Sequence, residues 1–216
     1  ESTKTILLIY EYCNGKDLNF YLSNERDNIN RNINKYILEI ANGIKDMHDK
    51  KIEHKDLKPA NIIICDNTIK IIDFGLSRSI EKQNKQIFAG TIDYIAPEIL
   101  ERRGNLNQDQ ILKGDIYAFG ITINELLSKL FPYNPLRNEQ DIINKVKKGE
   151  RPPLVKYDST VFKRNDIYIK YKVLIQICWS HEINSRPSAS ELVQLIKDVQ
   201  DDQVSKESFI EKISSR

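Results

Sequence analysis

The apolar residues of this chain recur mostly at helical spacing, and this constrains its fold more than any other feature. The longest stripe is formed by Ile29, Ile33, Tyr36, Ile37, Ile40, Ile44 and Met47. Intervals of three and four residues predict one long amphipathic helix, which must bury its apolar side against other elements. Similar stripes predict helices around residues 18–22, 116–127, 142–146, 171–178 and 192–199. The last of these begins after Ser188 with Glu191 three residues later, which is the pattern of a capping box.

A few short β-branched runs predict strands. Residues 6–12 form an apolar and aromatic run that ends at a turn, so we expect a buried strand there. Residues 62–65 and 69–72 are separated by three turn-forming residues, which predicts a β-hairpin. Residues 76–90 are sparse in apolar side chains and predict an irregular surface loop, and residues 201–216 predict a polar, frayed tail. The chain therefore reads as one mainly helical domain with small strands.

The charge balance and the cysteines exclude several classes of protein. Lys and Arg number 33 against 31 Asp and Glu, so the net charge of +2 does not indicate a nucleic-acid binder. No apolar run approaches the roughly 18–20 residues that span a bilayer, and no signal peptide is visible. Cys13, Cys65 and Cys178 are odd in number and far apart, so neither a disulfide framework nor a zinc site is expected. A reducing, cytoplasmic location is the expectation, and the oligomeric state stays open.

Four polar side chains flank the predicted hairpin and suit phosphate chemistry. Asp56, Lys58 and Asn61 precede its first strand, and Asp73 follows its second strand. Because a hairpin brings its two ends together, Asn61 and Asp73 can share one cation, and hard oxygen ligands suit Mg²⁺. Phosphoryl transfer also needs a carboxylate that orients the attacking hydroxyl and accepts its proton. Each of these residues taken alone is equally compatible with an ordinary loop or turn.

Three motifs in the same order and spacing resemble the large, C-terminal lobe of eukaryotic-type protein kinases. Residues 54–61 match the catalytic loop HRDxxxxN, residues 73–75 match DFG, and residues 96–98 match APE. By this resemblance, Asp56 is the catalytic base and Lys58 steadies the transferred phosphate. The resemblance also implies an ion pair of Glu98 with Arg186 and a bracing contact from Asp115 to the catalytic loop.

The resemblance also implies cofactors and partners. ATP with Mg²⁺ and a protein substrate are expected, the metal being held by Asn61 and Asp73. The residues expected at the nucleotide are Glu11 and Cys13 of the hinge, Ile63 of the floor, Lys58, Asn61 and Asp73. Lys58 and the dipeptide Gly90-Thr91 are similar to the serine/threonine pattern, whereas Cys178-Trp179 is similar to tyrosine kinases and their nearest relatives. A tyrosine-kinase-like serine/threonine kinase satisfies both, with a tyrosine kinase or an inactive kinase-like scaffold as alternatives.

The fold implied by the resemblance is α+β for the family and mainly α in this chain, a C-lobe helical bundle with a small hairpin. Residues 1–13 then correspond to the last strand of the small lobe and the hinge, residues 14–200 to the C-lobe, and residues 201–216 to the tail. The family's small lobe also carries a glycine-rich loop and a phosphate-gripping lysine. Neither is present, and the chain begins at Glu1 with Met47 as its sole methionine, so we expect an inactive fragment of a longer kinase.

The activation segment between the DFG and APE motifs departs from the family. Lys55 stands where the family has arginine before the catalytic aspartate, and it lacks the planar fork that grips a phosphate. Among residues 73–98 the hydroxyl groups belong to Ser77, Ser79, Thr91 and Tyr94, and residues 80–90 carry none. We therefore expect that the activity of the complete enzyme does not depend on phosphorylation of this segment.

Overall fold

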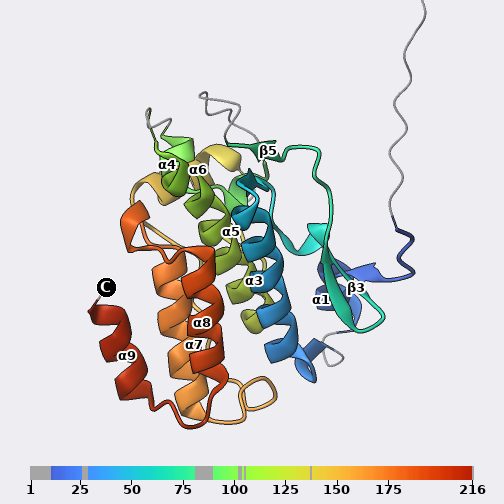
Figure 1. Ribbon diagram of the computed structural model, residues 1–216, viewed down its shortest axis with the longest axis vertical. Helices are drawn as coiled ribbons and strands as arrows, with labels where there is room; N and C mark the ends of the chain where they lie inside the picture. The colour runs from blue at the N-terminus through green and yellow to red at the C-terminus, as the bar shows by residue number, and fades with distance from the viewer. Residues whose placement is uncertain are drawn as a thin grey trace, which may run out of the picture.

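A bundle of helices carries two small antiparallel sheets on one side (Figure 1). The computed structural model describes residues 11–25, 29–80, 90–101, 104, 106–136 and 138–215. Its helices are α1 (Leu18–Asn24), α3 (Ile33–Asp49), α4 (Pro97–Leu100), α5 (Gln108–Ser128), α6 (Glu139–Lys147), α7 (Asn165–Cys178), α8 (Ala189–Gln200) and α9 (Lys206–Ser214). Its strands are β1 (Lys16–Asp17), β2 (Ile52–Glu53), β3 (Ile62–Cys65), β4 (Thr68–Ile71) and β5 (Arg78–Ser79).

The bundle is organised around α5, which is buried along most of its length. It packs against α3 and α7, while α8 lies against α3 and α7. The contact between α5 and α7 is close at Gly120, where an added Cβ would lie 2.9 Å from the Cβ of Cys178. The stripes that predict α3, α5, α7 and α8 supply much of the core, and the capping box at Ser188 is present. The predicted helical domain is confirmed.

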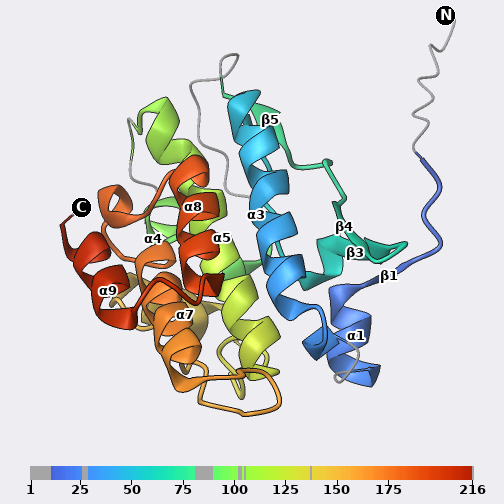
Figure 2. The same ribbon diagram turned by 60° about the horizontal axis from the view of Figure 1, so that its bottom comes forward.

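The predicted hairpin is formed by β3 and β4, and α3 holds it in place. Its turn residues Asp66 and Asn67 have φ values of 49° and 61°, the left-handed conformation that tight hairpin turns require. Tyr36 Oη donates to Asn67 Oδ1 at 2.7 Å, and Ile69 N donates to Glu39 Oε2 at 2.9 Å. The three-stranded sheet β1-β3-β4 therefore lies beside α3, on the opposite side from α9 (Figure 2).

Two loop predictions are corrected by short elements. The segment after residue 201 is not frayed, because α9 buries Phe209 completely against the bundle. Lys170 Nζ donates to the carbonyl oxygens of Asp198, Asp201 and Val204 at 3.0 Å each, which fixes the connection from α8 to α9. The segment 76–90 contains β5, which pairs with β2, and its residues 81–89 lie outside the described part of the chain. The strand predicted at residues 6–12 falls mostly on residues outside that part as well.

The prediction that the cysteines form no disulfide is wrong. Cys13 and Cys65, 52 positions apart, form a disulfide with a Cα–Cα distance of 5.7 Å, and Cys178 is buried and outside this disulfide. The pairing of β1 with β3 brings them together, since Lys16 lies opposite Ile64. The spacing of the cysteines in the sequence does not reveal this proximity. The expectation of a reducing compartment, which was inferred from that spacing, therefore loses its basis.

A helix must hold about 20 mostly apolar residues to cross a bilayer. Within residues 11–25, 29–80, 90–101, 106–136 and 138–215, none combines the length and the apolar character needed to cross a membrane.

Candidate active site

The loop between β2 and β3 is anchored on α5 by the buried carboxylate of Asp115. Its Oδ2 accepts from His54 N at 2.9 Å and its Oδ1 accepts from Lys55 N at 3.0 Å. His48 Nε2, at the end of α3, lies 3.0 Å from Oδ2. Burial would raise the pKa of Asp115, but the contacts with His48 and the two backbone amides outweigh it and lower that pKa. Asp115 therefore braces the loop as a charged group, as the sequence predicts.

His48 is a functional contact that sequence reasoning missed. Its position next to Met47 indicated only the end of a helix, and no local pattern connects it with a residue 67 positions away. The side chain is buried, and it joins the C-terminus of α3 to α5 through Asp115. Two core helices thus determine together where the loop lies.

Asp56, Lys58 and Asn61 converge at the centre of this loop. Lys58 Nζ lies 2.8 Å from Asp56 Oδ2, and Asn61 Nδ2 donates to the same oxygen at 2.9 Å. Asn61 Nδ2 also donates to the backbone carbonyl of Asp56 at 2.8 Å. From the other side, the backbone N and the hydroxyl of Thr91 donate to Asp56 Oδ1 at 2.9 and 2.8 Å.

These contacts determine the charge of Asp56. Its partial burial raises the pKa of the carboxyl, whereas the hydrogen bonds from Lys58 and Thr91 lower it by more, so the pKa lies below the ordinary value. Asp56 is therefore ionised at neutral pH. Lys58 Nζ also donates to Thr91 Oγ1 at 2.6 Å, so one hydroxyl lies between an ammonium and a carboxylate.

Gly90 lets the activation segment approach the catalytic loop this closely. Its φ of +112° is rarely adopted by residues with a side chain, and an added Cβ would lie 2.5 Å from the carbonyl oxygen of Lys55. A larger residue here would displace the backbone that places Thr91 on Asp56.

Asp73 lies at the other end of the hairpin. The preceding residue, Ile72, donates its backbone N to the carbonyl of Asn61 at 2.9 Å, so the two strand ends are neighbours. Asp73 has a φ of 63°, and its exposed carboxylate accepts from Gly75 N at 3.2 Å. Phe74 is 44% exposed and contacts the His54 ring edge-on, with the ring centroids 5.3 Å apart.

The remaining predicted nucleotide contacts lie on the three-stranded sheet or in the segment that leads into it. Glu11 is exposed and pairs with Lys70 of β4 at 2.9 Å. Cys13 is linked to Cys65, and Ile63 is half-buried on β3, opposite Asp17 and Lys70. Their roles stay predictions.

A buried ion pair holds the far end of the activation segment. Arg186 Nη1 and Nη2 donate to the two carboxylate oxygens of Glu98 at 2.7 Å each, and both side chains are fully buried. Arg186 also donates to the carbonyls of Ser180 at 2.9 Å and Lys113 at 3.1 Å. Its guanidinium lies over the ring of Tyr117, 5.1 Å from the centroid. The pair predicted between Glu98 and Arg186 is confirmed.

Comparison with known proteins decides the family. The family model described as protein kinase domain matches residues 1–195. This chain belongs to the protein kinase family. It is 34% identical over 88% of its length to RGS domain-containing serine/threonine-protein kinase A of Dictyostelium discoideum, covering 16% of that protein. It is 30% identical over 78% of its length to serine/threonine-protein kinase mos of Patiria pectinifera, covering 47% of that protein.

A further relative gives the same picture. The chain is 30% identical over 89% of its length to the probable serine/threonine-protein kinase roco6 of Dictyostelium discoideum, of which it covers 9%. The chain thus spans less than half the length of each of these three relatives. The α+β architecture described above is the large lobe expected for a protein kinase.

The residues that would hold a magnesium ion fit that metal by their chemistry. Asn61 Nδ2 makes both of its contacts with Asp56, so the side-chain oxygen of Asn61 is the atom that would bind the metal. Asp73 would contribute an exposed carboxylate. Among the described residues, no group of three or more His, Cys, Asp and Glu side chains could bind a metal. Mg²⁺ suits such a site, because it commonly takes one or two protein oxygens and completes its shell with phosphates and water.

Proposed function

We propose that this chain is the catalytic large lobe of a serine/threonine protein kinase. One observation carries the proposal: the Thr91 hydroxyl lies 2.8 Å from Asp56 Oδ1 and 2.6 Å from Lys58 Nζ. The carboxylate and the ammonium thus both contact one aliphatic hydroxyl, which supports a role in orienting the hydroxyl of a Ser or Thr substrate. The relatives described above are named as serine/threonine kinases, which supports the same substrate class.

In the proposed reaction, a substrate hydroxyl attacks the γ-phosphorus of ATP. The new bond joins the substrate oxygen to phosphorus, and the bond from phosphorus to the bridging oxygen of ADP breaks. Asp56 orients the hydroxyl and accepts its proton, while Lys58 offsets the negative charge of the phosphoryl oxygens. Asn61 and Asp73 would hold Mg²⁺, which supplies charge neutralisation at the phosphates when bound.

The ionised state of Asp56 suits this role. Its pKa lies below the ordinary value, so it is available as an acceptor throughout the neutral range. Catalysis then depends chiefly on position, which Asp115, Asn61 and Thr91 determine. The 216 residues contain no GxG sequence, so the phosphate-gripping parts of a complete site are proposed to come from other residues of the whole protein.

The test is Asp56→Asn in the complete protein. The amide keeps the shape of the side chain and cannot accept the proton, so we expect peptide phosphorylation to fall by roughly 10²–10⁴-fold. Binding of ATP and Mg²⁺ should change little, because Asn61 and Asp73 are intact. Radiometric transfer to a serine peptide and calorimetric nucleotide binding measure the two effects.

Asp202→Asn is the matched control, because Asp202 is an exposed surface residue that pairs with Arg164. It should phosphorylate the peptide at the wild-type rate. If Asp56→Asn also retains that rate, Asp56 is not the base. A wild-type protein that binds partners and transfers no phosphate would instead be a kinase-like scaffold, and the proposal would fail.

A further inference from the structure

A two-stranded ladder joins the catalytic loop to the start of the activation segment. In β2 and β5, Ile52 lies opposite Ser79 and Glu53 lies opposite Arg78. The ladder is continued by a hydrogen bond from Ile80 N to the carbonyl of Lys51 at 3.0 Å. Glu53 precedes Asp56 by three residues and Arg78 follows Asp73 by five, so movement of this ladder moves both halves of the site.

The side chains of this ladder form a buried ion pair. Glu53 is 2% exposed, and its Oε2 accepts from Arg78 Nε at 2.6 Å. The Arg78 side chain is itself 7% exposed. Lys55 of the same loop and Asp115 of α5 are the other charged groups that influence this carboxylate. Two cations and two anions thus meet where the catalytic loop, β5 and α5 adjoin.

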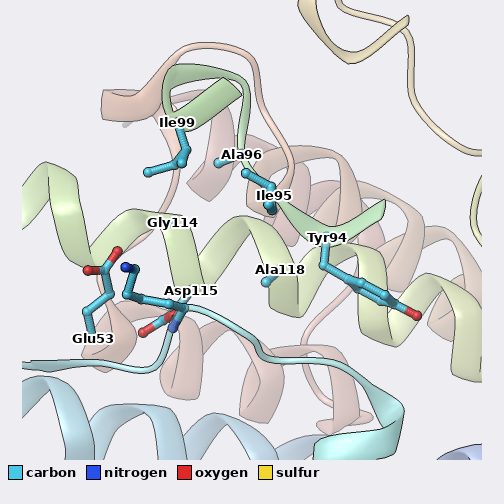
Figure 3. A pocket seen from close by; sticks show the side chains of 9 residues that line it. Glu53, Tyr94, Ile95, Ala96, Ile99, Gly114, Asp115 and Ala118 are labelled. Carbon is cyan, nitrogen blue, oxygen red and sulfur yellow. Dashed lines mark hydrogen bonds between the residues drawn. The ribbon is translucent and has the colours of Figure 1, made fainter. Parts of the chain in front are cut away.

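A small pocket lies beside Glu53. Glu53 and Asp115 lie on one side of it, and Ile95, Ala96 and Ile99 lie on the other (Figure 3). Its volume is about 20 Å³, which is room for one water molecule. Among the described residues that line it, Glu53 and Asp115 carry the anionic groups.

The hydroxyls of the activation segment are also largely engaged elsewhere. Ser77 Oγ donates to the carbonyl of His54 at 3.2 Å, and Thr91 is bonded to Asp56. Tyr94 Oη donates to Glu125 Oε2 at 2.6 Å. Phosphorylation at Ser77 or Thr91 would break a contact with the catalytic loop, and phosphorylation at Tyr94 would break its buried bond to Glu125.

We propose that Glu53 is a positioning residue whose carboxylate serves as a built-in anion, holding Arg78 and the activation segment on the catalytic loop in place of a phosphate. This inference rests on the proposed kinase function. It assigns a role to a buried acidic residue that the reaction itself does not use.

The ionisation of Glu53 gives the inference a measurable signature. Burial and the charge of Asp115 raise the pKa of Glu53 to about 7, while Arg78 and Lys55 act in the opposite direction. The carboxylate is therefore charged above neutrality and loses its charge below it. Because a hydrogen bond to a charged group is stronger than one to a neutral group, its hold on Arg78 should weaken as the pH falls.

The experiment compares Glu53→Gln with the wild-type complete protein in a peptide phosphorylation assay between pH 6 and 8.5. At pH 8 we expect kcat to fall about tenfold, with little change in the KM for ATP. The wild-type kcat should decline as the pH falls through 7. The kcat of Glu53→Gln should not show this decline, and over the whole pH range it should stay near the value that the wild type has at low pH.

Three further variants make the result specific. Glu53→Asp keeps the charge and should restore part of kcat together with the pH dependence. Arg78→Gln should lose as much kcat as Glu53→Gln, and the double variant should lose no more, because both remove one contact. Glu207→Gln changes an exposed glutamate on α9 and should behave as the wild type. If Glu53→Gln does not fold, Glu53→Asp and Arg78→Gln still carry the comparison.

Two results would overturn the inference. One is a Glu53→Gln enzyme with a kcat within twofold of the wild type and an unchanged pH profile. The other is a large, reversible loss of wild-type activity on phosphatase treatment, mapped to the activation segment. If Asp56→Asn remains inactive in the same assay, either result removes the role of Glu53 and leaves the proposed kinase function in place.

Discussion

Replacing Glu125 by glutamine should remove a large part of the pH dependence of stability. Glu125 lies on α5, is buried, and accepts a hydrogen bond from Tyr94 Oη at 2.6 Å. Burial raises the pKa of Glu125 from its ordinary value of 4.5 to about 7, although the bond from Tyr94 acts to lower it. Desolvation of the charged form therefore outweighs its hydrogen bond.

The sign of the effect follows from the direction of this shift. Between pH 4.5 and 7 the folded protein holds a proton on Glu125 that the unfolded chain has released, so stability falls as the pH rises through this window. A pKa shift of this size corresponds to about 3 kcal/mol of unfolding free energy, since each pKa unit is worth about 1.4 kcal/mol. Glutamine mimics the protonated form and should not show this loss.

Urea unfolding of the wild type and Glu125→Gln, measured at intervals from pH 5 to 8, tests this expectation. The fluorescence of Trp179, the single tryptophan, reports unfolding because its side chain is buried. Tyr94→Phe removes the bond that lowers the pKa of Glu125, so in this variant the decline in stability should continue to higher pH. Glu207→Gln is the exposed control and should follow the wild type. Parallel pH profiles for the wild type and Glu125→Gln would refute the reasoning.

Two further substitutions test buried cations in the bundle. Arg186→Met leaves the fully buried Glu98 without its partner and should lower the unfolding free energy by about 3–5 kcal/mol in urea unfolding, and adding Glu98→Gln should recover most of the loss. If the double variant is no more stable than Arg186→Met, the other contacts of Arg186 account for the lost stability. Lys170→Met removes the donor to three carbonyls and should cost about 1–3 kcal/mol, with hydrogen exchange accelerated in α9. Unchanged exchange in α9 would show that Phe209 alone holds this helix.

The helices and the hairpin could be predicted because their patterns are local. The stripe of α3 repeats from Ile33 to Met47, about four turns of helix, and the strands of the hairpin are separated by a short turn. The convergence of Asp56, Lys58 and Asn61 also follows from their closeness in sequence. Asp115 and Arg186 were found through the family motifs, since nothing in their surroundings indicates a partner 60 or 88 residues away.

The contacts that sequence reasoning missed depend on packing between distant segments. β2 and β5 have two residues each, which is too short for an alternating pattern, so the buried pair of Glu53 with Arg78 left no signal. The joining of Cys13 to Cys65 depends on the register of β1 with β3. α9 is polar apart from a few positions, so the burial of Phe209 against the bundle left little signal in the sequence.

The anchoring of the catalytic loop on Asp115 has a consequence for its dynamics. The amides of His54 and Lys55 donate to a buried carboxylate rather than to a neighbouring strand or helix. Solvent reaches these two amides when α3, α5 and the loop separate, which requires the centre of the bundle to open. A loop, ordinarily among the first segments to exchange its amide hydrogens, should here exchange as slowly as the helices that form the core. The loop that carries the proposed catalytic residues should thus stay closed for as long as the protein stays folded.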